Sequence, residues 1–428
     1  MTAGGRVWPW LDPALFAGSL VIYALALPLG LGRVEVAPLV AAGLALDTST
    51  LPLPFTLLAV RVADFLPLGD SALRANLASA LLCALAVALV GRLALEVVAL
   101  LRPPAHARQE SRDFLHEPIA AAGAALAAAL SLSVFQMGVG AGSAPATLLL
   151  LLGGLLAGFF LLQNSNAHLA GYALAALGGL ATGVDPIAGP LLWPPLAALS
   201  LWSLRKGARW PLLAPLCFVL GWGGAGLGTL AAASTALSAS SLLPHMRSLA
   251  VSARATLLST AIELGDEVGV IGVLLAAIGM VALASRALVL SAWLALTGLT
   301  SLLFARLADP VGDAMAAARA AMPLAIVVSF VFASVGLLHV SARLGRARMA
   351  SSLALAVILL FSPALDRGSS RWHRRAGPPM HLLDRALERA RLRSMVLPGS
   401  AEMEGLFRLA RAMGLRPDLE IVGSAGKH

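Results

Sequence analysis

The 428-residue sequence has few charged residues, few cysteines and almost no lysine. Charged residues make up 12% of the chain, about half of the share typical of a soluble protein, whereas 59% of residues are hydrophobic and the mean hydropathy is +0.85. These values exclude a soluble enzyme and a disordered chain. They indicate a helical protein that crosses a membrane several times, because a lipid-facing surface must be apolar. The two cysteines, Cys83 and Cys217, lie inside apolar runs, which excludes a disulfide scaffold and favours packing roles.

The basic residues are almost all arginine, since only Lys206 and Lys427 are lysines. Together with heavy use of alanine, leucine and glycine, this bias favours a GC-rich genome over a nucleic-acid partner, although the net charge is +9. No phosphate-binding or dinucleotide-binding glycine pattern occurs, and the eight histidines are scattered without metal-ligand spacing. The sequence therefore predicts no cofactor, no metal site and no nucleic-acid partner.

Eleven apolar runs approach or exceed the roughly 17–25 residues that a helix needs to cross a bilayer. They lie near 13–31, 72–101, 117–135, 146–162, 167–184, 187–204, 211–233, 267–284, 287–305, 320–341 and 349–365. The sequence therefore predicts an all-α polytopic membrane protein, with a transmembrane domain over residues 1–365.

Short basic loops orient these predicted spans. Three loops carry three basic residues each, namely Arg102, Arg108 and Arg112; Arg205, Lys206 and Arg209; and Arg343, Arg346 and Arg348. With eleven spans all three loops lie on one side, and the positive-inside rule makes that side cytoplasmic. This predicts a multi-pass protein of the bacterial inner membrane, with a cytoplasmic N-terminus and an extracytoplasmic tail. The arginines that follow residue 365 favour the alternative of ten crossings and a cytoplasmic tail.

The tail, residues 366–428, has soluble character. A short apolar run at 394–397 is followed by a helix pattern over 401–413 and a second apolar run at 419–422. This order predicts a small strand–helix–strand fragment of an α/β type.

The loop between the first two predicted spans, residues 31–71, is long and rich in proline, which predicts short interfacial or re-entrant helices within it. Three segments in and after it form a pattern: PLPFTLL at 52–58, FLPLG at 65–69 and LRANLASALL at 73–82. Two later segments extend it, Asp309-Pro310 before a span that reaches Gly336, and LRPDLEIV at 415–422. The pattern resembles that of the bacterial protein O-mannosyltransferase-like family, a domain of unknown function in the GT-C glycosyltransferase superfamily.

This resemblance implies a GT-C fold that transfers a sugar from a polyprenyl-phosphate donor to an unknown acceptor on the outer face of the membrane. Such a reaction needs a carboxylate base to activate an acceptor hydroxyl. The resemblance places Glu35 at the second acid of a family motif, and Asp47 is the other candidate carboxylate of the first loop. A solvated loop charge is the alternative for Glu35, and an Asx turn with Thr48 is the favoured alternative for Asp47.

Cations on the outer side are candidates for binding the donor phosphate. Arg74 and Asn76 match a family motif, and Arg247 and Arg319 lie in or near outer segments. An arginine at a span end often snorkels to lipid headgroups instead. For Arg74 and Asn76 the alternative is structural, namely that they tie the first loop to the second span.

Four motif positions depart from the family. Gly32 stands in place of the leading acid, the histidine–diproline motif falls on 47–50 (DTST), and two later turns read GAGS at 140–143 and GVDP at 183–186. These departures leave open an inactive family member that acts as an accessory or lipid-binding subunit. A transporter or flippase is a third alternative, disfavoured because Arg92 and Glu96 are the main charged residues inside a predicted span, and their spacing lets them neutralise each other.

Overall fold

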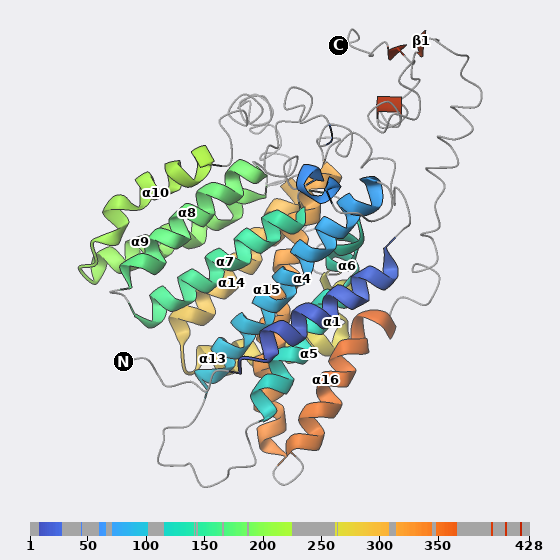
Figure 1. Ribbon diagram of the computed structural model, residues 1–428. Coiled ribbons are helices and arrows are strands. Elements are labelled where there is room, and N and C mark those ends of the chain that lie inside the picture. Colours follow the sequence, from blue (N-terminus) through green and yellow to red (C-terminus); the bar gives the residue numbers. More distant parts are fainter. Residues whose placement is uncertain are drawn as a thin grey trace.

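The computed structural model describes residues 8–27, 44, 60–65, 71–101, 115–140, 142, 144–164, 167–185, 188–224, 262, 264–307, 314–344, 348–365, 395–396, 407–408 and 420–421. Most of this part of the chain is helical (Figure 1). The helices are α1 (Leu11–Ala26), α4 (Ser71–Ala99), α5 (His116–Leu130), α6 (Leu132–Val139), α7 (Ala144–Gln163), α8 (His168–Val184), the 3₁₀ turn η4 (Gly189–Leu192), α9 (Trp193–Arg205), α10 (Trp210–Gly224), α13 (Val270–Ala284), α14 (Leu288–Leu307), α15 (Ala314–Arg343) and α16 (Arg348–Leu365).

Each predicted apolar run overlaps one helix or two consecutive ones, but the number of clear membrane spans among the described residues is smaller than predicted. By length and apolarity, three helices could cross a membrane: Leu73–Ala99, Ala144–Gln163 and Met322–Arg343. The bent pair α5–α6 would be a fourth. The described residues thus support three or four spans in place of the predicted eleven.

The difference arises because several apolar runs are helical over too few residues. Helices α9 and α13, whose ends both lie within the described residues, have 13 and 15 residues. At a rise of about 1.5 Å per residue they extend about 20 and 22 Å, less than the roughly 30 Å of bilayer hydrocarbon.

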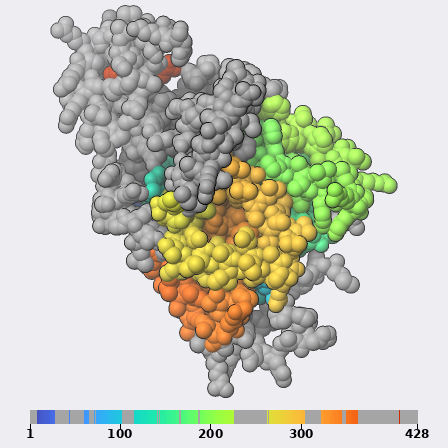
Figure 2. Space-filling model, turned by 180° about the vertical axis from the view of Figure 1, so that it is seen from behind, coloured from blue at the N-terminus to red at the C-terminus, as the bar shows by residue number. Residues whose placement is uncertain are grey.

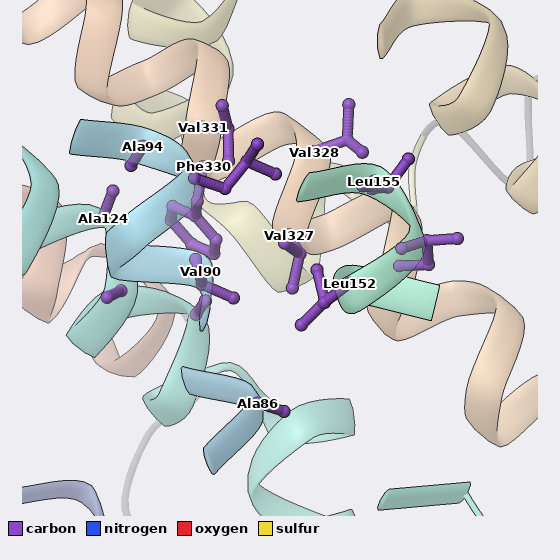
Figure 3. Packing of buried hydrophobic residues seen from close by; sticks show 14 of the residues in the cluster. Ala86, Val90, Ala94, Ala124, Leu152, Leu155, Val327, Val328, Phe330 and Val331 are labelled. Atoms are coloured by element: carbon purple, nitrogen blue, oxygen red, sulfur yellow. The ribbon is translucent and has the colours of Figure 1, made fainter. Parts of the chain in front are cut away.

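Helices α4, α5, α7 and α15 form the centre of the bundle (Figure 1). Figure 3 shows Val90 of α4, Leu152 of α7, and Val327 and Phe330 of α15 directed toward a common interior, and all four are almost completely buried. Helix α5 adds a face of seven buried alanines, which lets its backbone approach its neighbours closely. Since lipid tails are as apolar as these side chains, tight packing of this kind is what holds helices together in a bilayer.

Two helix crossings bring backbones into contact at glycines. A Cβ atom added to Gly279 of α13 would collide with the carbonyl oxygen of Phe332 in α15, and one added to Gly336 of α15 would collide with that of Leu275 in α13. Gly179 of α8 and the carbonyl of Phe218 in α10 form a second crossing of the same kind. These positions allow no side chain without moving a helix.

The remaining helices surround this centre. Figure 2 shows α13 and α14, in yellow to light orange, on one face of the molecule, between α16 in orange and the α8–α10 group in green. Both α13 and α14 pack on α15. On another face, α1 packs on α4 (Figure 1), and Arg92 of α4 links the two helices.

The predicted pairing of Arg92 with Glu96 is confirmed, because Arg92 Nη2 lies 2.6 Å from Glu96 Oε1. Its other nitrogen, Nη1, lies 3.9 Å from Asp12 Oδ2 of α1. The pair therefore neutralises itself within α4 and also connects α4 to the first helix.

In the tail, two-residue strands β1 (Met395–Val396) and β2 (Glu420–Ile421) pair in parallel, with Met395 opposite Glu420 and Val396 opposite Ile421. Both lie inside the runs for which strands are predicted. Apart from residues 407 and 408, the rest of segment 366–428 lies outside the described residues. The complete strand–helix–strand fragment is therefore not shown.

Candidate functional site

Two of the six predicted site residues, Arg74 and Asn76, are described with their side chains. Arg319 lies in the N-terminal part of α15, where the structure describes the backbone alone. Glu35, Asp47 and Arg247 lie outside the described residues. The structure therefore shows the side-chain contacts of the candidate site only at the beginning of α4.

Arg74 fastens a short preceding helical segment, residues 60–64, to the first turn of α4. Its Nη1 lies 2.9 Å from Asp64 Oδ1 and donates a hydrogen bond to the Asp64 carbonyl oxygen at 2.6 Å. Ser71 Oγ donates to the same Oδ1 at 2.9 Å, and Arg61 Nη1 lies 3.5 Å from Oδ2. The Arg74 and Asp64 side chains are about one quarter exposed. These contacts correspond to the structural alternative for Arg74, that of tying the first loop to the second span.

A polar strip continues along α4 from this anchor. Asn76 is 1% exposed and Ser79 is 3% exposed, so both face protein instead of lipid. Ser79 Oγ accepts a hydrogen bond from the Gly142 N–H at 3.3 Å, which ties α4 to the turn between α6 and α7. The beginning of α4 and the α6–α7 turn are therefore parts of one polar region.

A second polar arrangement lies where α5 ends and α6 begins. The apolar run 117–135 predicts one straight helix, but the chain bends by 69° between α5 and α6, at Ser131. Glu267 is 8% exposed and accepts hydrogen bonds from the Ser133 N–H at 3.2 Å and from Ser133 Oγ at 3.1 Å. The first N–H groups of a helix lack intrahelical partners and carry the positive end of its dipole. The Glu267 carboxylate therefore accepts a hydrogen bond from one of these N–H groups and places a negative charge at the positive end of the α6 dipole.

Side chains of α1 and α4 support the same bend. The Tyr23 hydroxyl donates to the Ala129 carbonyl at 3.4 Å, and the Cys83 thiol lies 3.6 Å from the Val134 carbonyl and 3.5 Å from the Tyr23 hydroxyl. Tyr23 and Cys83 are completely buried. A Cβ atom on Gly138 would overlap the Tyr23 ring, so this glycine makes room for it. Irregular backbone at membrane depth persists where it is buried in protein, and these contacts provide that burial.

Asp185, a further acid at a predicted span end, forms a turn. Its Oδ1 accepts a hydrogen bond from the Ala188 N–H at 2.9 Å, and its carbonyl oxygen accepts one from the Gly189 N–H at 2.8 Å. Asp185 therefore closes a turn at the C-terminal end of α8. Within the described ranges, no three His, Cys, Asp or Glu side chains are grouped so as to hold a metal ion.

Asp64 and Glu267 are polar residues of these arrangements that no sequence motif marks as site residues. A signal for Asp64 is its spacing, three residues after Arg61 and ten before Arg74. A signal for the bend is the pair Ser131 and Ser133 inside an apolar run, because serine favours the beginning of a helix. The partnership of Ser133 with Glu267 has no local signal, since 134 residues separate them.

Replacing Asp64 by alanine is expected to lower the free energy of unfolding by about 1–3 kcal/mol, because the Arg74 guanidinium then loses its carboxylate. The double variant D64A/R74A should recover part of that loss, which a double-mutant cycle measures by unfolding in detergent micelles. Arg61→Ala is the matched control, and should cost under about 1 kcal/mol because Arg61 is more exposed and 3.5 Å from the carboxylate. A coupling energy near zero between Asp64 and Arg74 would contradict the anchoring role.

No family model, curated protein or solved structure matches this chain. The functional assignment therefore depends on its residues and their geometry.

Proposed function

We propose that the protein is a GT-C-type glycosyltransferase that moves a sugar from a polyprenyl-phosphate donor to an acceptor at the outer face of the bacterial inner membrane. The proposal includes a GT-C-like bundle of transmembrane helices and a small α/β fragment at the C-terminus. The observation that carries it is the anchored beginning of α4, where Arg74 and Ser71 hold Asp64 against the helix. This is the described part of segment 52–82, the most specific segment of the resemblance.

Burial of polar groups supports a functional role for this region. Asn76 and Ser79 occupy the interior face of a helix whose other buried positions are apolar. Burying polar side chains within a membrane bundle costs free energy, so such side chains commonly mark functional sites. The anchored segment thus has the rigidity that a positioned catalytic loop needs.

In the proposed reaction, Glu35 removes the proton of the acceptor hydroxyl, whose oxygen attacks the anomeric carbon of the donor sugar. The bond from that carbon to the phosphate oxygen breaks, and polyprenyl phosphate leaves. Arg247 and Arg319 are the cations assigned to the departing phosphate, and Asp47 is the second candidate carboxylate. Arg74 is assigned to positioning, because Asp64 already binds its guanidinium.

Exchange of Glu35 for glutamine is expected to lower sugar transfer about 10²- to 10⁴-fold, the usual contribution of a general base. Wild type and variant are reconstituted in nanodiscs with a radiolabelled polyprenyl-phosphate sugar, and both transferred and released sugar are counted. Glu117→Gln is the matched control, since it removes a carboxylate at the predicted cytoplasmic end, and should leave the rate unchanged. Equal rates for wild type and Glu35→Gln would contradict the assignment of the base.

A second candidate function is an accessory, lipid-binding subunit. It is favoured by the departures from the family motifs, namely Gly32 in place of the leading acid and GAGS at 140–143 in place of an acid. Under this alternative, wild type and Glu35→Gln both bind the donor lipid and neither transfers nor hydrolyses it. If labelled donor lipid crosses the membrane of sealed vesicles and no sugar is transferred or released, that result would instead indicate the transporter alternative.

A further inference from the structure

A cavity of about 400 Å³ opens at the opposite end of α4 from the anchored segment. It lies between the ends of several helices, with Leu100 after α4, Gln163 of α7, Trp202 of α9 and Leu288 of α14 in its wall. Its lining is mainly apolar, and its volume is within the range of small-molecule sites. Leu288 and Val289 are largely exposed, so the cavity opens toward the region where lipid would lie.

One cation lines this cavity, and a second lies next to a residue of its wall. Arg286, in the turn between α13 and α14, is part of the wall. Lys206, directly after α9, places its Nζ 4.2 Å from the centre of the ring of Trp202, a residue that lines the cavity. A cation over the face of an indole ring is attracted by it, so the stacking holds the ammonium group close to Trp202. The two charged side chains in or next to the cavity wall are therefore both basic.

Arg286 is held in place by a second helix. Its Nη1 donates a hydrogen bond to the Leu101 carbonyl oxygen at 2.7 Å, at the C-terminal end of α4. A guanidinium has five N–H donors. This one hydrogen bond fixes the position of the Arg286 side chain and leaves other N–H donors able to bind an anion. The turn between α13 and α14 is thereby connected to α4 at the edge of the cavity.

We propose that this cavity is a binding site for an anionic phospholipid of the bilayer, with the headgroup phosphate between Arg286 and Lys206 and an acyl chain along the apolar wall. Charge complementarity decides the occupant, because Arg286 lines the apolar cavity and Lys206 stacks on Trp202 of its wall. Basic pockets between transmembrane helices on the cytoplasmic side commonly bind such headgroups. The basic loop at 205–209 belongs to this end, and the predicted topology places it in the cytoplasm. The site is independent of the proposed glycosyl transfer.

The test compares binding of phosphatidylglycerol and of phosphatidylcholine with identical acyl chains, by native mass spectrometry of the purified full-length protein. We expect K206Q/R286Q to bind phosphatidylglycerol about tenfold or more weakly, since each basic residue near an anionic headgroup contributes about 1 kcal/mol. The matched control is R205Q/R209Q, which removes two charges from the same end but none from the cavity wall, and should bind as wild type does. Elution as a single folded species checks that each variant is intact.

A third variant, Ala287→Trp, fills the cavity without changing charge and should also weaken phosphatidylglycerol binding. The proposal is overturned if K206Q/R286Q and R205Q/R209Q lose affinity equally, since that result indicates general surface charge. Equal binding of phosphatidylcholine by wild type would overturn the role of charge. Displacement of the lipid by millimolar inorganic phosphate would overturn the lipid assignment, since it would show that the site binds an anion without needing an acyl chain. Unchanged phosphatidylglycerol binding by Ala287→Trp would show that the lipid does not occupy this cavity.

Discussion

Exchange of Gly279 for leucine is expected to lower the free energy of unfolding by about 3 kcal/mol or more. The new side chain would collide with the backbone of α15 at Phe332, and a helix backbone cannot give way as a flexible side chain can. Helix α15 is the most buried of the three candidate spans, so separating α13 from it disturbs the centre of the bundle. The measurement is the unfolding midpoint in detergent micelles, by circular dichroism or by loss of the folded peak in size-exclusion chromatography.

Gly18→Leu is the matched control, because Gly18 lies on an exposed part of α1 where an added Cβ meets no atom within 4 Å. Its effect should stay within about 0.5 kcal/mol. The pair G279A/G336A should cost less than the sum of its single variants, since one collision already separates the helices and relieves the second. Equal stability of Gly279→Leu and Gly18→Leu would show that α13 and α15 do not cross at this glycine.

Replacing Glu267 by alanine is expected to have the second-largest effect, a loss of about 2–3 kcal/mol. The substitution leaves the N–H and hydroxyl of Ser133 without their carboxylate at a buried helix beginning, where hydrogen bonds to charged groups are worth more than neutral ones. Glu267→Gln should cost less, because its amide oxygen still accepts one of the two bonds. Thermal unfolding of the purified variants in one detergent measures both.

A double-mutant cycle with Ser133→Ala serves as the control for Glu267. If the two side chains interact as described, E267A/S133A is more stable than the sum of the single effects predicts. A loss below 0.5 kcal/mol for Glu267→Ala would mean that the bend between α5 and α6 does not depend on this carboxylate.

The positions of the helices could be read from the sequence with good accuracy. The predicted runs 146–162 and 167–184 coincide with α7 (Ala144–Gln163) and α8 (His168–Val184) within two residues. Polar residues interrupt the apolar pattern between them and so mark the ends of both helices. The number of spans was overestimated because an apolar run measures hydrophobicity, whereas crossing a bilayer requires uninterrupted helix of sufficient length.

The bend and the candidate site were harder to predict. Within the run 117–135, two serines change the average hydropathy little, yet a new helix begins after the first, and the second, Ser133, binds a distant carboxylate. The sequence leaves the role of Arg74 open between phosphate binding and anchoring, because its partner Asp64 lies ten residues away in a separate short helical segment. Contacts of this kind depend on the path of the chain, which local patterns do not determine.

The bend at Ser131 also has a consequence for the order of assembly. Glu267, the carboxylate that binds Ser133 beside the bend, is made 134 residues later than Ser133, so α5 and α6 are synthesised well before Glu267 exists. Chains emerge from the ribosome at about 5–20 residues per second, which leaves the α6 helix beginning without that partner for roughly 7–27 seconds. The contacts at the bend can therefore be completed only after synthesis has passed residue 267.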